Sequence, residues 1–227
     1  MHKLPLALGP APRILCLGAH SDDIEIGCGG TLLRLLQEYP GARVQWVVFA
    51  CTGPRSAEAQ ASANAFLQGA AESKIVVKDF RDGFLPYTGV QVKEFFETLK
   101  PFDPDLIFTH YRHDLHQDHR LLCELTWNTF RNHLVLEYEI PKYDGDLGQP
   151  NLFVELDEPI CRRKSEYLLQ HFRTQRDRHW FTDETFRSLL RIRGIECRAD
   201  TSYAEAFYCR KLVLTRSAVP DSTRGLK

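Results

Sequence analysis

Two short stretches of the chain concentrate side chains that bind metals and move protons. Residues 19–27 hold a histidine and two adjacent aspartates, and residues 110–119 hold four of the nine histidines and two more aspartates. Imidazole and carboxylate groups are the usual ligands of catalytic zinc, which takes three of them and leaves a fourth position for water. If the two stretches meet in the fold, they predict a metal site.

Within these stretches, three residues are the candidate metal ligands. His20 and Asp23 are close enough in sequence to bind one cation from a single turn, and His119 can supply the third ligand. Consecutive residues of a turn point in different directions, so Asp22 is left free to face the attacking water. Zinc lowers the pKa of a bound water to about 7, so a carboxylate base can act at neutral pH. We therefore expect Asp22 to be the general base.

Two residues just before His119 complete the expected site. Attack on a carbonyl creates an oxyanion, and a protonated His116 is the candidate to stabilise it and to give a proton to the leaving amine. Asp118 is the candidate to hold one imidazole in the required tautomer. Each stretch alone has a plainer explanation, because aspartates before a helix often only cap it and histidines can lie in a solvated loop. Two such stretches, each after a predicted strand, favour chemistry.

The elements that must position these residues alternate regularly over the first half of the chain. Apolar runs predict strands at 13–18, 43–50, 74–78 and 105–109, and the segments between and after them predict helices at 27–38, 56–71, 90–99 and 118–131. This alternation indicates an α/β fold with a Rossmann-like, mostly parallel sheet flanked by helices. Both motifs then follow strands, where such sheets place their ligands. Asp118 is expected to cap the last of these helices.

The second half predicts a smaller C-terminal elaboration of strands and helices. Strands are expected at 134–140 and 151–155, as a candidate pair, and at 205–214, with helices at 158–172 and 182–193. We expect one domain over 1–227, with a core at roughly 12–214 and a loose tail at 217–227. The glycines at 27, 29 and 30 lack the spacing of a phosphate-binding loop, so we expect them to allow close packing of strand and helix.

Composition argues against several kinds of partner. With 29 basic and 30 acidic residues, the chain carries no excess charge for binding nucleic acid or an anionic membrane. No window approaches the roughly 20 apolar residues of a membrane span, and the N-terminus lacks the pattern of a signal peptide. The seven cysteines are odd in number and show no zinc-ribbon spacing, which favours reduced thiols and a cytoplasmic location.

The two motifs resemble those of a known family, the PIG-L/LmbE-like de-N-acetylases. The hallmark of that family is Ala-His-Pro-Asp-Asp near the N-terminus and a later His-x-Asp-His, which stand here as residues 19–23 and 116–119. A weaker match extends to residues 203–207. Ser21 stands where the family usually has proline, a change that loosens the turn slightly and removes no chemical group.

The resemblance implies zinc-dependent hydrolysis of the N-acetyl group of an amino sugar, usually N-acetylglucosamine in a larger conjugate. It implies the same metal ligands, base and oxyanion partner as the residues themselves. It further implies that Arg55 holds sugar hydroxyls or a substrate anion, and that Asp82 binds sugar hydroxyls. A solvent-facing arginine and a plain Asp-Gly turn are the alternatives at these positions. We group His113 with the substrate-binding residues, while His110 stays undecided between lining the pocket and bonding within its loop.

Two functions from other classes stay open at this point. Two histidines and a carboxylate also describe the site of a non-haem Fe(II) oxygenase, although that chemistry usually occupies an all-β barrel. A nucleotide-binding α/β module without catalysis is the second alternative. The same ligands accept Fe²⁺ or Co²⁺ in place of Zn²⁺. The sequence names neither the sugar nor its conjugate, it leaves a homo-oligomer open, and the basic stretch 171–187 fits either an anionic substrate group or a solvated helix end.

Overall fold

A computed structural model describes residues 3–213 of the chain. Its strands are β1 (Arg13–Gly18), β2 (Arg43–Val48), β3 (Glu72–Val77), β4 (Leu106–His110), β5 (Leu134–Tyr138), β6 (Leu152–Leu156) and β7 (Tyr203–Cys209). Its α-helices are α1 (Asp23–Glu38), α2 (Pro54–Phe66), α3 (Gly89–Leu99), α4 (Gln117–Thr129), α5 (Glu158–His171) and α6 (Asp183–Cys197). None of these helices is long and apolar enough to cross a bilayer. The tail expected at 217–227 lies outside the described residues.

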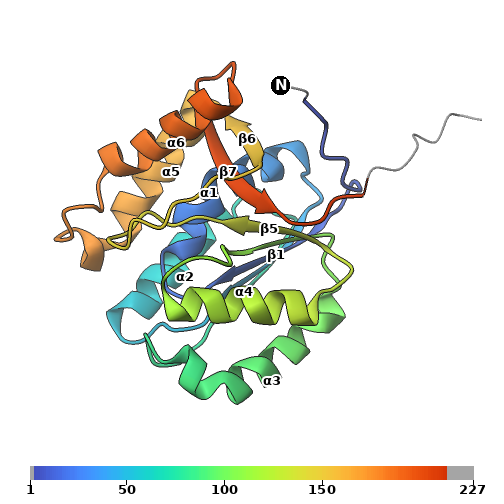
Figure 1. Ribbon diagram of the computed structural model, residues 1–227, viewed down its shortest axis with the longest axis vertical. Helices are drawn as coiled ribbons and strands as arrows, with labels where there is room; N and C mark the ends of the chain where they lie inside the picture. Colours follow the sequence, from blue (N-terminus) through green and yellow to red (C-terminus); the bar gives the residue numbers. More distant parts are fainter. Residues whose placement is uncertain (1–2, 214–227) are drawn as a thin grey trace, which may run out of the picture.

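Seven strands form one mixed sheet in the order β3-β2-β1-β4-β5-β7-β6 (Figure 1). Strands β1 to β5 are parallel, and β7 runs antiparallel to both β5 and β6. The prediction of an α/β fold with a mostly parallel sheet and a C-terminal elaboration is confirmed. The continuous apolar runs that gave that prediction belong to strands covered on both faces.

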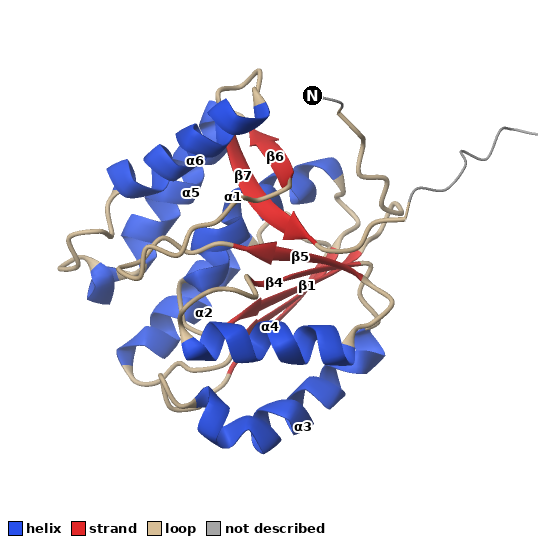
Figure 2. Ribbon diagram, viewed as in Figure 1, coloured by secondary structure: helices blue, strands red, loops and turns tan. Residues whose placement is uncertain are grey.

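Helices cover both faces of the sheet (Figure 2). Helices α3 and α4 pack on one face, and α1, α2, α5 and α6 pack on the other. Successive residues of a strand point to opposite faces, so Cys16 joins the core under α1 and α2, while Leu15 and Leu17 join the core under α3 and α4. The sheet is therefore held in place by two apolar layers.

The chain reverses its direction of winding at β1. From β1 it moves to β2 and β3 on one side, and it later returns to place β4 on the other side. The crevice beyond the carboxyl ends of β1 and β4 is thus the topological switch point, where open α/β sheets bind ligands. The turn at 19–22 follows β1 and the turn at 111–116 follows β4, so both predicted motifs reach this point.

Several sequence-based boundaries and one strand pairing were wrong. Helix α1 begins at Asp23 and not at residue 27, because the acidic residues Asp23 and Glu25 suit the first turn of a helix. Strands β5 and β6 do not pair with each other, because β7 inserts between them in the sheet. The long gap between β6 and β7 in the sequence hid that insertion. Helix α6 also extends to Cys197, beyond the expected end at 193.

The glycines of α1 allow close packing, as predicted. A Cβ atom on Gly27 would lie 2.1 Å from the Tyr138 ring of β5, and one on Gly29 would lie 2.7 Å from the Phe66 ring of α2. A Cβ atom on Gly30 would lie 2.9 Å from a carboxylate oxygen of Glu205. Real Cβ atoms do not approach other atoms so closely, so larger residues would push α1 off the sheet.

A buried ion pair makes hydrogen bonds to the backbone of α1. The backbone N–H groups of Gly30 and Thr31 donate to the carboxylate of Glu205, at 2.8 and 2.6 Å. Lys164 of α5 donates both to the backbone carbonyl of Ile26 and to Glu205, each at 2.6 Å. The Glu205 carboxylate of β7 thus accepts hydrogen bonds from N–H groups in the middle of α1, and the Lys164 ammonium of α5 donates to a carbonyl oxygen of the same helix.

Candidate metal centre

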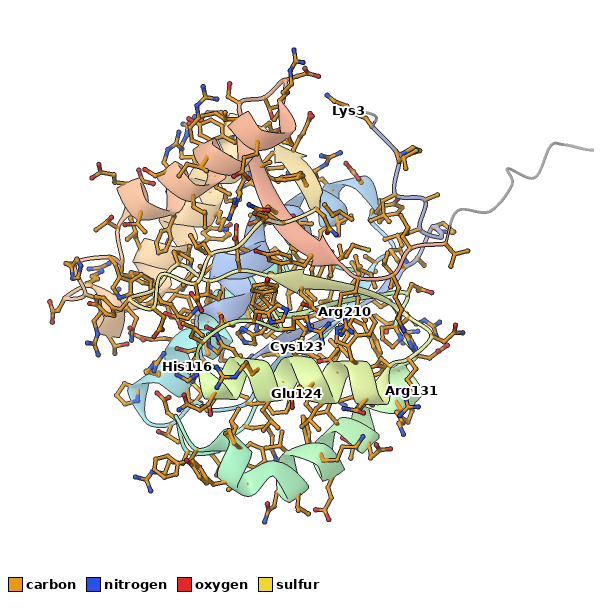
Figure 3. All side chains as sticks on the ribbon, viewed as in Figure 1. Lys3, His116, Cys123, Glu124, Arg131 and Arg210 are labelled. Atoms are coloured by element: carbon orange, nitrogen blue, oxygen red, sulfur yellow. The ribbon has the colours of Figure 1, made fainter. Side chains whose placement is uncertain are left out.

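The centre is built from two turns at the carboxyl ends of neighbouring parallel strands. β1 and β4 are in direct register, with Cys16 opposite Phe108, so the segments that leave them run side by side. The first turn carries His20 and leads into α1 at Asp23. The second turn leads into α4, and Figure 3 shows His116 at the N-terminal end of that helix. His20, Asp23 and His119, which are 99 residues apart at most, come into contact here.

Three ligand atoms form a compact triangle at this point. Nδ1 of His20 lies 3.1 Å from Nε2 of His119 and 3.3 Å from Oδ2 of Asp23. The remaining edge, from Nε2 of His119 to Oδ2 of Asp23, is 3.5 Å. Zinc–ligand bonds of 2.0–2.2 Å in a tetrahedron place neighbouring ligand atoms about 3.4 Å apart. The triangle therefore has the dimensions of one face of a zinc coordination shell. We call these three residues the donor cluster.

Carboxylates behind the two imidazoles turn them toward the triangle. Asp114 lies 2.9 Å from Nδ1 of His119, so this nitrogen carries a proton and Nε2 offers its lone pair to the triangle. Nε2 of His20 lies 3.3 Å from Asp118 and 3.1 Å from Asp82, which leaves Nδ1 for the triangle. Metal-binding histidines are oriented in this way.

The electrostatics of the donor cluster favour a cation. Burial lowers the pKa of His119 to about 3, so its imidazole is neutral, as metal binding requires. Burial also lowers the pKa of His20, but the nearby carboxylates of Asp23, Asp118 and Asp82 outweigh it and hold that pKa well above its ordinary value. The pocket thus attracts positive charge to Nδ1 of His20, where a proton and a metal ion would compete.

Asp22 lies beside the donor cluster and is not part of the triangle. It is buried, and burial with the adjacent Asp23 carboxylate raises the pKa of Asp22 to about 6. One nitrogen of Arg55 lies 3.4 Å from its Oδ1 atom. A carboxylate whose pKa lies near neutrality can both accept and return a proton, which suits a general base.

His116 caps α4 through its side chain. Its Nδ1 accepts a hydrogen bond of 3.2 Å from the backbone N–H of Asp118, so the proton of the neutral ring lies on Nε2. Burial and the neighbouring His20 lower the pKa of His116. The expectation that Asp118 caps this helix was wrong, because its carboxylate instead accepts the backbone N–H groups of Gly83 and Leu85. His116 is thus a neutral donor, whereas the sequence suggested a protonated one.

His110 packs against the donor cluster inside the protein. It is fully buried, its Nε2 accepts the backbone N–H of Ala19 at 2.9 Å, and its ring stacks on His119 with centroids 3.8 Å apart. Its Nε2 also lies 3.2 Å from Asp23. His110 is the last residue of β4 and bonds to the turn after β1, so it fits neither of the two roles left open from the sequence, which were lining the pocket and bonding within its own loop.

The three expected substrate-binding residues lie in different surroundings. Arg55 lies in the first turn of α2 and contacts Asp22 and Asp82, while Asp82 contacts both Arg55 and His20. Asp82 is more than half exposed and contacts the buried His20. His113 is exposed on the second turn, with its ring against that of Tyr111. The structure thus brings Arg55 and Asp82 to the donor cluster and places His113 at the surface of the same turn.

Sequence reasoning missed Asp114 and the lysine that accompanies it. Lys142 donates to Asp114 at 2.9 Å and to Asp146 at 2.7 Å, and Asp146 accepts the backbone N–H of Leu115. These contacts fasten the loop after β5 to the turn that carries the histidines. Asp114 lies inside the His-rich stretch, five residues before His119, so its position was a usable signal. Nothing in the sequence pairs it with Lys142.

Comparison with known proteins places this geometry in a family. The PIG-L family, described as GlcNAc-PI de-N-acetylase, matches residues 15–130. Among solved structures, an N,N'-diacetylchitobiose deacetylase from Pyrococcus horikoshii is 22% identical with a TM-score of 0.68, over 87% of this chain and 83% of that one. The A40926 pseudoaglycone deacetylase Dbv21 is 18% identical with a TM-score of 0.63, over 87% and 96%.

A third similar structure has a different activity. GalB, the 4-carboxy-2-hydroxymuconate hydratase from Pseudomonas putida KT2440, is 15% identical with a TM-score of 0.71, over 90% of this chain and 98% of that one. At such identities the likeness establishes the fold alone. The reaction has to be argued from the site.

Proposed function

Because this chain belongs to the PIG-L family, as the resemblance of its motifs indicated, we propose that it is a metal-dependent deacetylase. Its substrate would be an N-acetylated amino sugar of the N-acetylglucosamine type within a larger conjugate, and its products acetate and a free amine. Two of the structures it resembles are named as deacetylases, one of N,N'-diacetylchitobiose and one of the A40926 pseudoaglycone. The proposal therefore rests on family and fold together with the site.

One observation carries this proposal. The atoms of the donor cluster stand 3.1–3.5 Å apart, while the carboxylate of Asp22 lies beside them and outside the triangle. Three ligands and a separate base are what metal-assisted hydrolysis requires. Capping residues alone would not explain why His119 of α4 is brought to the start of α1.

The donor cluster would hold the cofactor, which we take to be Zn²⁺, with Fe²⁺ or Co²⁺ as alternatives. A bound zinc ion supplies Lewis-acid chemistry that acidifies water and polarises a carbonyl. Asp22 takes a proton from the attacking water as the water oxygen bonds to the amide carbon. Arg55, at 3.4 Å, keeps positive charge beside this carboxylate.

His116 would act on the developing oxyanion. The hydrogen bond at Nδ1 places the proton of His116 on Nε2. This N–H can donate to the carbonyl oxygen, and the hydrogen bond becomes stronger as negative charge develops on that oxygen. The proton taken by Asp22 then passes to the amide nitrogen as the carbon–nitrogen bond breaks, which leaves acetic acid and a neutral amine, and the acid then loses its proton to solvent to become acetate. Asp22, with a pKa of about 6, suits both halves of this transfer.

The rest of the substrate would meet the loops around the centre. Arg55, Asp82 and His113 are the candidate contacts to sugar hydroxyls or to an anionic group, and Asp118 supports His20 from behind. A cytoplasmic location and a possible homo-oligomer stay predictions from the sequence.

A substrate panel tests the activity. Purified protein is incubated with N-acetylated sugars, nucleotide sugars and glycosides, and released acetate is measured. We expect turnover of at least one substrate, its loss with a chelator and its recovery with zinc. Oxygen consumption with Fe²⁺ would favour the oxygenase alternative, and nucleotide binding that survives chelation would favour the nucleotide-binding module.

The variant Asp22→Asn tests the base. Its amide cannot accept the proton, so we expect unchanged metal content and a loss of about 10²–10⁴-fold in kcat, the usual contribution of general base catalysis. Asp144→Asn, an exposed aspartate on the loop after β5, is the matched control and is expected to keep full activity. Parental activity of Asp22→Asn at saturating zinc would overturn the assignment.

A further inference from the structure

A serine holds the arginine that contacts the proposed base. Ser21 lies in the turn after β1, is fully buried, and accepts a hydrogen bond of 3.0 Å from Nε of Arg55. Among residues 3–213, the Ser21 side chain makes no other hydrogen bond. Arg55 stands in the first turn of α2, so the contact joins the segments that follow β1 and β2.

The same guanidinium spans two carboxylates. Its terminal nitrogens lie 3.4 Å from Oδ1 of Asp22 and 3.5 Å from Oδ2 of Asp82. Both distances exceed the 3.0 Å at which Nε meets Ser21, so the serine contact is the shortest of the three. A guanidinium is a rigid planar fork, and fixing Nε therefore fixes the directions of the two terminal nitrogens.

We propose that Ser21 is a positioning residue that acts through Arg55. Its hydroxyl sets the plane of the guanidinium, and the guanidinium holds the carboxylate of Asp22 in the direction that proton transfer needs. Proton transfer depends on geometry first, so a carboxylate that turns away loses rate without any loss of metal. This proposal rests on the proposed function, since it assigns Asp22 the work of a base.

Burial makes the hydroxyl difficult to replace. Ser21 has no exposed surface, so water cannot readily take the place of its oxygen when the side chain is shortened. Alanine would leave Nε of Arg55 without this acceptor, and the guanidinium would be free to turn toward Asp82. A residue that only shaped the turn would act without Arg55, and this difference can be measured.

A double-mutant cycle separates the two explanations. Ser21→Ala, Arg55→Met and the double variant are compared with the parent for kcat, KM and metal content. We expect Ser21→Ala to lower kcat about 5-fold, the value of one hydrogen bond near 1 kcal/mol, with unchanged metal content. In the Arg55→Met background the same substitution should change kcat less than about 2-fold.

Two further variants control for packing. Ser21→Cys fills the position with a somewhat larger group that is a weaker acceptor and should resemble alanine, whereas Ser21→Thr keeps the hydroxyl and should restore kcat. An equal loss from Ser21→Ala in both backgrounds would overturn the proposal, because Ser21 would then act without Arg55. A Ser21→Ala protein with parental kcat would overturn it as well.

The cycle is also measured in urea unfolding, which needs no substrate. Coupling between positions 21 and 55 in the unfolding midpoint would support the link between these residues, and its absence would overturn it. If the parent releases no acetate from any substrate, the proposed function fails while this unfolding cycle still decides the link.

Discussion

Two buried groups of charged side chains flank α1, and they differ in how their charges are satisfied. The donor cluster at the start of α1 gathers two imidazoles and a carboxylate whose ligand atoms face one another at 3.1–3.5 Å. The paired cluster, under the middle of α1, joins opposite charges: Lys164 with Glu205, and Arg193 with Glu139.

The paired cluster is complete in itself. Arg193 donates two parallel hydrogen bonds of 2.7 and 2.6 Å to Glu139. Glu205 accepts hydrogen bonds from Lys164 and from two backbone N–H groups of α1. The donor cluster instead gathers ligand atoms around one point, and nearby carboxylates hold the pKa of His20 above its ordinary value, so that a proton or a metal ion is favoured there. Buried charge is common to both clusters, so burial alone does not distinguish a candidate functional site from a structural ion pair. The two are distinguished by whether each buried charge faces an opposite charge, as in the paired cluster, or faces other ligand atoms, as in the donor cluster.

The largest effect should follow from removing a ligand of the donor cluster. His119→Ala removes one corner of the triangle, and we expect metal content and acetate release to fall to background. His133→Ala, a histidine at the opposite ends of the strands, is the control and should change neither. Retention of metal by His119→Ala would show that the triangle is not the binding site.

The next effect should come from breaking the paired cluster. Lys164→Met leaves the carboxylate of Glu205 buried without its counter-ion, which costs about 3–5 kcal/mol in the free energy of unfolding. Urea unfolding of the metal-free protein measures this cost. The double variant with Glu205→Gln, which removes both charges, should recover part of it. A loss below about 1 kcal/mol would mean that the pair contributes little.

A smaller effect is expected behind the donor cluster. Asp114→Asn replaces the carboxylate that orients His119, and we expect metal affinity to fall about 10–100-fold while folding is kept. Asp146→Asn is the matched control, since Asp146 contacts Lys142 and the backbone of Leu115. Equal losses from both variants would point to the loop, and not to the imidazole, as the cause.

The smallest effect sets the scale for both clusters. Arg43 and Glu72 form an ion pair of 2.8 Å on the surface, at the start of β2 and β3. Both side chains are at least half exposed, so Glu72→Gln should cost less than about 1 kcal/mol in unfolding. A larger cost would weaken the contrast between exposed and buried pairs.

The sequence predicted what depends on short-range pattern. Apolar runs located β1 and β4, and the residues that follow them, His20 and His119, were grouped because parallel strands share a carboxyl edge. The support of the centre depends on contacts between distant segments, such as Lys142 with Asp114. No local pattern carries such a contact. The same limit hid the position of β7 between β5 and β6, which only the whole sheet decides.

The prediction that Asp118 caps α4 was wrong for a different reason. Aspartate is a favoured capping residue, and Asp118 stands near the right place, yet His116 takes that role with its ring nitrogen. The carboxylate of Asp118 was instead committed to backbone groups of the loop after β3. A propensity cannot anticipate which of two suitable side chains a neighbouring loop will claim.

The carboxylate that enters the middle of α1 has a consequence for the order of assembly. Glu205 belongs to the last strand, whereas the helix it completes carries Asp23 at its first position. During synthesis the early motifs emerge long before that strand does. Helix α1 therefore gains this carboxylate only after β7 has been synthesised, and a fragment that ends at residue 130 lacks it.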